Sequence, residues 1–122
     1  MIRTGDREGD VATVSVVVVN WNSGTLLRQC LASLAAQSVL PEVVWVVDNA
    51  SSDGSGGCVS EFPNCRLLSP GANLGFAAGN NLAFRECTSE FVALLNPDAF
   101  ADPGWLAALL AAAEANPDCA SF

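Results

Sequence analysis

Apolar runs and amphipathic segments alternate along this chain. The runs at 14–19 and 43–47 consist almost entirely of valine, and neither alternates between apolar and polar positions. Strands that are buried on both faces of a parallel sheet have this pattern. The segments at 66–69 and 91–95 are shorter strand candidates. We therefore predict four strands, with the most uniformly apolar one, 14–19, at the centre of the sheet between 43–47 and 91–95.

Helical patterns fill the segments between these strands. Apolar residues recur at intervals of three and four, which is the spacing that lines one face of a helix. This spacing predicts helices at about 24–37 and 103–115. Two further helical segments are predicted at about 54–61 and 75–87, where the pattern is less regular.

The alternation of strand and helix predicts an α/β fold with a mainly parallel sheet and helices on both of its faces. Residues 1–12 are mostly polar and show no periodicity, so we expect a mobile tail there, followed by one domain at 13–122. Ligands of such sheets bind beside the carboxyl ends of the strands. We therefore expect function in the polar loops at 20–24, 48–54 and 96–98.

The charged residues exclude several kinds of chemistry. All five basic residues are arginines and the net charge is −8, so we expect no nucleic-acid partner, because phosphate backbones are held mainly by Lys and Arg. The chain contains no His and no Lys. This excludes a His general base, a Schiff-base lysine and the lysine of a phosphate-binding P-loop.

The five cysteines have irregular spacing and form no C-x-x-C pair. An odd count of this kind is a poor disulfide framework, so we expect reduced thiols in a cytoplasmic protein. We expect no signal peptide, and the apolar runs are far shorter than the roughly 20 residues of a membrane span. We expect no membrane span in this chain, and the sequence leaves membrane association of the intact protein open.

Asp48 is the first residue with candidate chemistry. It ends a continuous apolar strand, where its carboxylate could accept hydrogen bonds from a ribose or a nucleobase. An Asx turn that starts the following loop explains the same residue. Asp53 and Gly54, further along this loop, favour a turn over a ligand contact.

Two other segments also have a functional and a structural interpretation. Asn96-Pro97-Asp98 follows the last predicted strand, and Asp98 offers a hard oxygen ligand suited to Mg²⁺ or Mn²⁺. A proline turn with Asp98 as a capping residue is the alternative. The segment 71–81 enters a helix with small residues, which would let an anion approach the free amides of that helix. Close packing of the helix on a strand would require the same small residues.

Taken in order, these motifs resemble the N-terminal half of a family-2 glycosyltransferase. The resemblance is carried by 14–22, 46–55, 73–81 and 94–98, and it covers about 13–122. The pair NLGFAAGNN and NPD is most similar to the rhamnosyltransferase-type branch. The resemblance implies a GT-A fold, which is a Rossmann-like nucleotide-diphospho-sugar transferase fold.

The resemblance also implies an activity and its partners. The activity would be inverting transfer of a sugar from a UDP- or dTDP-sugar, with dTDP-rhamnose as one such donor. The acceptor would be a glycan or lipid-linked molecule in polysaccharide biosynthesis. In the family the catalytic base is an Asp of the C-terminal half, so we expect the base beyond Phe122 and no transfer by these 122 residues alone.

Matched to this chain, the resemblance assigns the donor site to three loops and one helix start. Asp48 would hold the nucleobase or ribose, and Asp98 would bind Mg²⁺ or Mn²⁺. The family's metal-binding DxD reads Asn96-Pro97-Asp98 here, so one of its two charges is absent and the metal affinity is in doubt. The residues expected to bind the donor are Asn20, Trp21, Asn22, Asp48, Asn73, Gly75, Asn80, Asn96 and Asp98.

Three other kinds of protein share parts of this pattern. A dinucleotide-binding Rossmann domain would carry G-x-G-x-x-G after its first strand, which is absent here. A receiver domain would carry a lysine near the end of its sheet, and the chain has no lysine. A non-catalytic nucleotide-binding or scaffold domain with a GT-A-like fold is the alternative that stays open.

Overall fold

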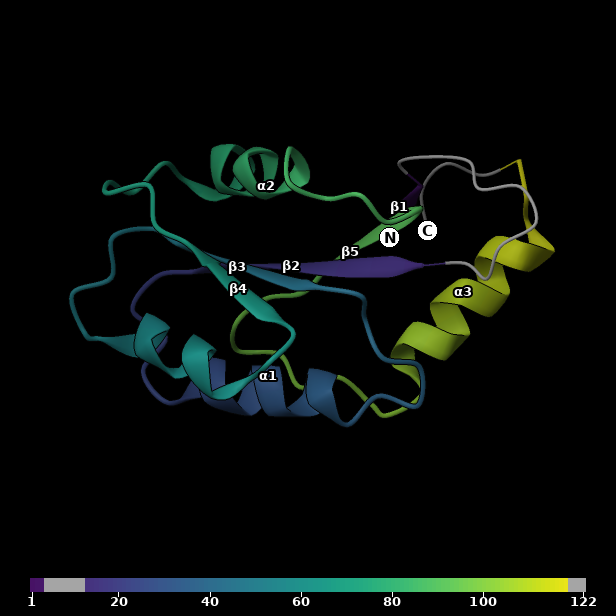
Figure 1. Ribbon diagram of the computed structural model, residues 1–122, viewed down its shortest axis with the longest axis horizontal. Coiled ribbons are helices and arrows are strands. Elements are labelled where there is room, and N and C mark those ends of the chain that lie inside the picture. The colour runs from purple at the N-terminus through teal and green to yellow at the C-terminus, as the bar shows by residue number, and fades with distance from the viewer. Residues whose placement is uncertain (4–12, 119–122) are drawn as a thin grey trace.

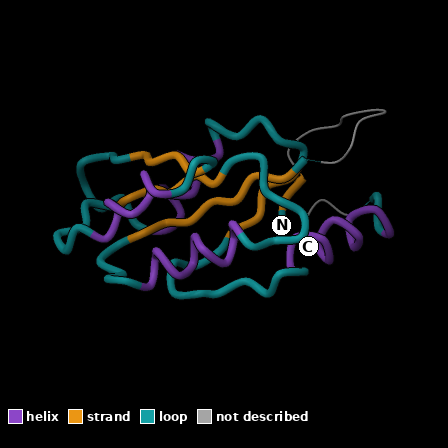
Figure 2. Tube along the Cα trace, turned by 60° about the horizontal axis from the view of Figure 1, so that its bottom comes forward, coloured by secondary structure: helices purple, strands orange, loops and turns teal. Residues whose placement is uncertain are grey.

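The computed structural model describes residues 1–3 and 13–118. They form three layers, with one sheet between two layers of helices (Figure 1). Helix α2 (Phe76–Phe84) covers one face of the sheet. Helix α1 (Leu26–Ala35), the 3₁₀ helix η1 (Ser55–Glu61) and helix α3 (Trp105–Ala115) pack on the other face. The strands lie in a single layer between these helices (Figure 2). Helices on both faces of an α/β sheet confirm the predicted architecture.

The sheet has five strands in the order β1-β5-β2-β3-β4. Their bounds are β1 (Ile2–Arg3), β2 (Val14–Asn20), β3 (Val44–Asp48), β4 (Cys65–Leu68) and β5 (Phe91–Leu94). β2 pairs in parallel with β3 on one side and with β5 on the other. The predicted order, with the valine-rich run at the centre, is confirmed.

The first strand was not predicted from the sequence. Ile2 and Arg3 pair antiparallel with β5, opposite Val92 and Phe91, and the Arg3 guanidinium carbon lies 4.8 Å from the centre of the Phe91 ring. The expected mobile tail is therefore wrong for these two residues. A two-residue edge strand forms through backbone pairing and is too short to show a period in the sequence. The remaining tail residues, 4–12, lie outside the described residues.

The valines of β2 face both layers in turn. Val14, Val16 and Val18 pack into a core with α1 and α3, while Val17 packs with Ala83 of α2. Side chains on a strand alternate between the two faces, so a strand covered on both sides needs apolar residues at every position. This explains why the sequence shows a continuous run in place of an alternating one.

The cysteines of the described residues are free thiols, as expected. Cys30, Cys58 and Cys65 are buried and Cys87 is half-buried. Burial raises the pKa of the Cys30 thiol to about 12, with a smaller contribution from the nearby Asp98 carboxylate. Burial likewise raises the pKa values of Cys65 and Cys87 to about 11. Burial also raises the pKa of the Cys58 thiol. These four thiols are therefore protonated and poorly nucleophilic at neutral pH. Cys119 lies outside the described residues.

No helix in the described part of the chain is long and apolar enough to span a bilayer.

The end of α1 is fastened to the start of α3 by the side chain of Gln37, which is 5% exposed. Its Nε2 donates to the Asp102 carbonyl at 2.7 Å, and its Oε1 accepts the Leu106 amide at 3.0 Å. Beside it, the amide of Ser38 donates to the Pro103 carbonyl at 2.8 Å. One buried amide thus satisfies backbone groups at the start of α3 that the helix itself leaves without partners.

Replacing Gln37 should detach the start of α3. We expect Gln37→Ala to lower the free energy of unfolding by about 2–3 kcal/mol, because the Leu106 amide is left in the core without an acceptor. Urea denaturation monitored by circular dichroism measures this. The control is Gln29→Ala, an exposed glutamine of α1, with an expected change within about 0.5 kcal/mol. Equal effects of the two substitutions would contradict the role assigned to Gln37.

Candidate functional site

The carboxyl ends of β2 and β5 mark the point where the order of strands reverses. From β2 the chain continues to β3 and β4 on one side and only later adds β5 on the other. Parallel α/β sheets bind ligands in the crevice at such a point. A cleft of about 380 Å³ opens here between the sheet and α2. It is lined by Val17, Val19, Trp21, Asn49, Asn73, Gly75, Phe76, Asn80, Leu94, Leu95, Asn96 and Pro97.

The floor of the cleft depends on a close approach of α2 to the sheet. A Cβ at Gly79 would lie 3.1 Å from Cγ1 of Val19 and 3.3 Å from Nδ2 of Asn49. Both distances are shorter than ordinary van der Waals contact, so the glycine lets the helix pack against β2 at this point. The small residues of segment 71–81 therefore serve close packing at least at Gly79, which was the structural interpretation of that motif.

Asn49 positions the loop that forms one wall of the cleft, and it was not among the predicted site residues. Its side chain is 2% exposed. Nδ2 donates to the Gly75 carbonyl at 3.2 Å, and Oδ1 accepts the Leu74 amide at 3.4 Å. Gly75 has a φ of 83°, a conformation that glycine adopts at little cost. A second polar residue directly after an apolar strand is the available signal in the sequence.

Five of the predicted donor-binding residues line the cleft, namely Trp21, Asn73, Gly75, Asn80 and Asn96. Trp21 stands at its mouth with 57% of its surface exposed. The side chain of Asn80 is different, because it is 7% exposed and makes no hydrogen bond with the described residues. An amide without a protein partner, in the wall of a cleft, is available to a ligand.

The cleft is lined by amides and apolar side chains. Among the described residues no charged side chain lines it, although the net charge of the chain is −8. Phe76, Leu94, Leu95 and Pro97 contribute to its apolar surface, while asparagines supply donors and acceptors. This lining suits an uncharged ligand that carries hydroxyl groups and an apolar face.

Asp48 lies next to the cleft in a separate network of polar groups. Its Oδ1 accepts the Ser51 hydroxyl, the Ser51 amide at 3.3 Å and Nδ2 of Asn20 at 3.4 Å. The bond to the Ser51 amide is the turn contact that the structural interpretation predicted. Oδ2 makes no hydrogen bond with the described residues. One oxygen of this half-buried carboxylate therefore holds the loop, and the other lies beside Gly56 with no hydrogen bond to it.

Asn20 and Asn22 use their side chains inside the protein. Asn20 is fully buried, and its Nδ2 donates to the Ser55 hydroxyl at 2.9 Å. Oδ1 of Asn22 accepts the Ser52 amide at 2.8 Å and the Asp53 amide at 3.3 Å. Both were predicted to line a nucleotide pocket. Neither residue lines the cleft, and their side chains fix the loop that follows β3.

Asp53 and Gly54 form the turn that leads into η1, as the sequence favoured. Oδ1 of Asp53 accepts the Ser55 amide at 2.9 Å and its Oδ2 accepts the Gly24 amide at 2.9 Å. Hydrogen bonding from Ser55 lowers the pKa of the Asp53 carboxyl. Gly54 has a φ of 75°, so the left-handed residue of this turn is a glycine.

The turn at 96–98 offers few ligands to a metal ion. The Asn96 carbonyl accepts the Ala99 amide at 3.0 Å, which closes the turn. The side chains of Asn96 and Asp98 are exposed, and Asp98 does not line the cleft. No group of three Cys, Asp or Glu side chains that could hold a cation occurs within 1–3 and 13–118. One carboxylate and one amide fit a divalent cation only if solvent or a bound phosphate supplies most of its ligands.

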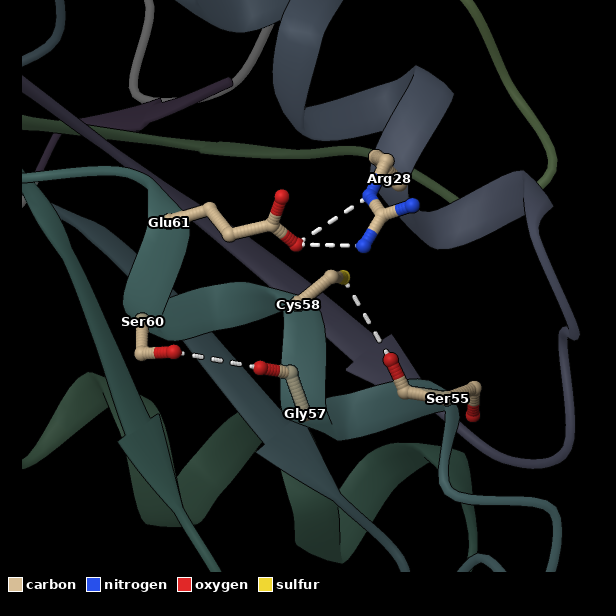
Figure 3. A network of polar contacts seen from close by, with 6 residues as sticks. All are labelled: Arg28, Ser55, Gly57, Cys58, Ser60 and Glu61. Atoms are coloured by element: carbon tan, nitrogen blue, oxygen red, sulfur yellow. Dashed lines mark hydrogen bonds and ion pairs between the residues drawn. The ribbon is translucent and has the colours of Figure 1, made fainter.

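A second groove, of about 350 Å³, lies between α1 and η1. On its wall Arg28 pairs with Glu61, and Nε to Oε2 is 3.1 Å (Figure 3). Figure 3 also shows Cys58 beside this pair, with its thiol donating to the Ser55 carbonyl. Since the groove's arginine is already paired with a carboxylate, this wall offers no free cation to an anionic ligand.

The sequence model described as glycosyl transferase family 2 matches residues 15–122. A curated N-acetylglucosaminyl-diphospho-decaprenol L-rhamnosyltransferase of Mycobacterium tuberculosis is 35% identical over 114 aligned residues, a match that covers 84% of this chain and 37% of the relative. The chain thus spans about a third of the length of the relatives that it matches.

Solved glycosyltransferase structures have the same fold. S. aureus TarS, residues 1–349 in complex with UDP-GlcNAc, matches with a TM-score of 0.78 and 26% identity, over 86% of this chain and 32% of TarS. The mannosyltransferase PcManGT from Pyrobaculum calidifontis, in complex with GDP-Man and Mn²⁺, matches with a TM-score of 0.70 and 28% identity, over 81% of this chain and 33% of that protein. The predicted GT-A fold is confirmed.

Releasing the loop at 71–75 should disturb the cleft. We expect Asn49→Ala to lower the free energy of unfolding by about 1–3 kcal/mol, because two backbone groups lose their buried partner. Hydrogen exchange should rise at the amide of Leu74, which loses its acceptor, before it rises in β2. The control is Asn81→Ala, an exposed asparagine of α2, which should change neither. Unchanged exchange at Leu74 in Asn49→Ala would contradict the assignment.

Proposed function

Since the chain belongs to glycosyl transferase family 2, we propose that it binds the donor of a glycosyltransferase. The reaction would transfer a sugar from a nucleoside diphosphate to a glycan or lipid-linked acceptor. The observation that carries the proposal is the cleft at the reversal point of the sheet, where the side-chain amide of Asn80 lies in the wall without a partner among the described residues. A cleft lined by neutral amides suits the hydroxyl groups of a sugar, which need donors and acceptors without charge.

The lining also bears on the class of donor sugar. Phe76, Leu94 and Leu95 give the cleft an apolar part beside its asparagines. A 6-deoxyhexose such as rhamnose carries a methyl group where most hexoses carry a hydroxymethyl group, and such an apolar part would accommodate that methyl. The rhamnosyltransferase relative supports the same choice. We therefore propose a UDP- or dTDP-sugar donor, with dTDP-rhamnose favoured.

Asp48 would hold the nucleoside. Ser51 fixes Oδ1, which leaves Oδ2 to accept a hydrogen bond from a ribose hydroxyl or a base N–H. Asn20 and Asn22 would act by fixing this loop, since their side chains are already bonded within the protein. Trp21, exposed at the mouth of the cleft, offers an aromatic face to the base or the sugar.

The charged end of the donor would lie toward the turn at 96–98. Asn96 and Asp98 would hold Mg²⁺ or Mn²⁺ there, and the cation would supply charge neutralisation of the diphosphate. The Mn²⁺ named with PcManGT supports a divalent cation. Inverting transfer also needs a base that deprotonates the acceptor hydroxyl. We assign the base to no described residue, because no described carboxylate lines the cleft.

Asp48→Ala should weaken the binding of UDP and dTDP. We expect a loss of at least about 1.5 kcal/mol, roughly tenfold in affinity, which is typical of a hydrogen bond to a charged group. Calorimetric titration of the folded variant measures this, with Asp118→Ala, an exposed carboxylate after α3, as the control. If Asp48 served only its turn, the variant would be less stable and its folded fraction would bind with unchanged affinity.

Metal and nucleotide should bind with positive coupling. One carboxylate beside a neutral Asn96 gives weak affinity for Mn²⁺ until a diphosphate supplies further oxygen ligands. Each ligand should raise the affinity of the other by the same factor, about tenfold. Titrations of UDP with and without Mn²⁺ measure it.

Variants of the turn at 96–98 should separate its effect on metal binding from its effect on nucleotide binding. We expect Asp98→Asn to abolish the coupling while the metal-free affinity for UDP stays the same, and Asn96→Asp to strengthen metal binding. Tight binding of Mn²⁺ in the absence of nucleotide, or coupling that survives Asp98→Asn, would place the metal site elsewhere.

A further inference from the structure

Gly56, in the first turn of η1, lies against the carboxylate of Asp48. A Cβ on Gly56 would sit 2.6 Å from Oδ2 of Asp48 and 3.1 Å from its Cγ. Non-bonded carbon and oxygen atoms do not approach this closely, so no side chain fits here while Asp48 keeps its position. The next residue, Gly57, has open space in the same direction. Neither glycine has a positive φ, so backbone conformation does not explain the glycine at position 56.

The helix that carries Gly56 is held on both sides of that residue. Ser55 accepts a hydrogen bond from the buried Asn20 at 2.9 Å. Cys58 and Val59 are packed in the core beneath α1, and on the outer side Glu61 is paired with Arg28 (Figure 3). A side chain at position 56 could not be relieved by a retreat of η1 without breaking these contacts. The Asp48 carboxylate would have to move.

Movement of Asp48 would change the group proposed to meet the nucleotide. Its Oδ1 is held by the amide and hydroxyl of Ser51, and this bonding directs Oδ2 toward Gly56. A rotation that carried Oδ2 away from a new methyl group would break the bonds of Oδ1 as well. Two contacts therefore fix the orientation of the carboxylate. Ser51 binds Oδ1, and the backbone of Gly56, which has no side chain, leaves room for Oδ2.

We infer that Gly56 is a positioning residue for nucleotide binding, which acts through Asp48 without touching the ligand itself. This inference rests on the proposed role of Asp48 in binding the nucleoside. It assigns to position 56 a requirement for glycine that comes from the neighbouring carboxylate.

Four variants of the chain test this, with UDP as the probe. Gly56→Ala should lower the affinity for UDP about tenfold, the loss expected when a hydrogen bond to a charged group is misplaced. Gly57→Ala, the matched control on the same helix, should bind UDP within about twofold of the original chain, because its Cβ meets no neighbour. The other two variants are Asp48→Ala and the double variant Asp48→Ala/Gly56→Ala.

The double variant separates positioning from general damage to the helix. Gly56→Ala should lower the melting temperature of the original chain but leave that of Asp48→Ala unchanged, because the group it collides with has been removed. The affinity of Asp48→Ala for UDP should likewise not fall further on adding Gly56→Ala. If Gly56→Ala fails to fold, a folded double variant supports the same collision.

Two results would overturn the inference. One is an unchanged affinity for UDP in Gly56→Ala. The other is a loss of stability or affinity from Gly56→Ala that persists in the Asp48→Ala background, including failure of both variants to fold. Failure of the proposed function gives a different pattern. In that case Asp48→Ala itself binds UDP as tightly as the original chain, whatever the melting temperatures of the variants show.

Discussion

The buried side chain of Asn20 connects the loops that follow the two central strands. It ends β2 directly opposite Asp48 at the end of β3, and it is fully buried. An amide in this position destabilises the fold unless its atoms find partners. It finds them in Ser23, Ser51, Ser55 and Asp48. The path of the loop after β3, the start of η1 and the direction of Asp48 all depend on this one group.

Two glycines then determine how closely helices approach the carboxyl edge of the sheet. Gly56 brings η1 against Asp48, and Gly79 brings α2 against Val19 and Asn49. The two helices lie on opposite faces of the sheet, but both contacts are made at its carboxyl edge. The polar network around Asp48 and the cleft under α2 are therefore formed at the same edge. The proposed placement of the donor uses both parts of this edge, with the nucleoside near Asp48 and the sugar near Asn80.

The fold could be predicted because its signals are local. Continuous valine runs showed the central strands, and the geometry of parallel sheets placed three distant loops at one edge. The roles of single polar residues could not be predicted in the same way. Asn49 and Gln37 bond to groups 26 and 69 positions away, and nothing in their own neighbourhood shows those partners. Asn20 and Asn80 appear alike in the sequence, yet one is bonded within the protein and the other faces the cleft.

The central claim is that a nucleoside diphosphate binds at the edge formed by β2, β3 and β5. The most direct measurement is a titration of the ¹⁵N-labelled chain with UDP and Mg²⁺, a diamagnetic ion, followed through amide chemical shifts. The account predicts saturable shifts at 48–51, 73–80 and 95–98, with little change at Arg28 and Glu61 in the groove between α1 and η1. Shifts confined to that groove, with the cleft residues unchanged, would contradict it.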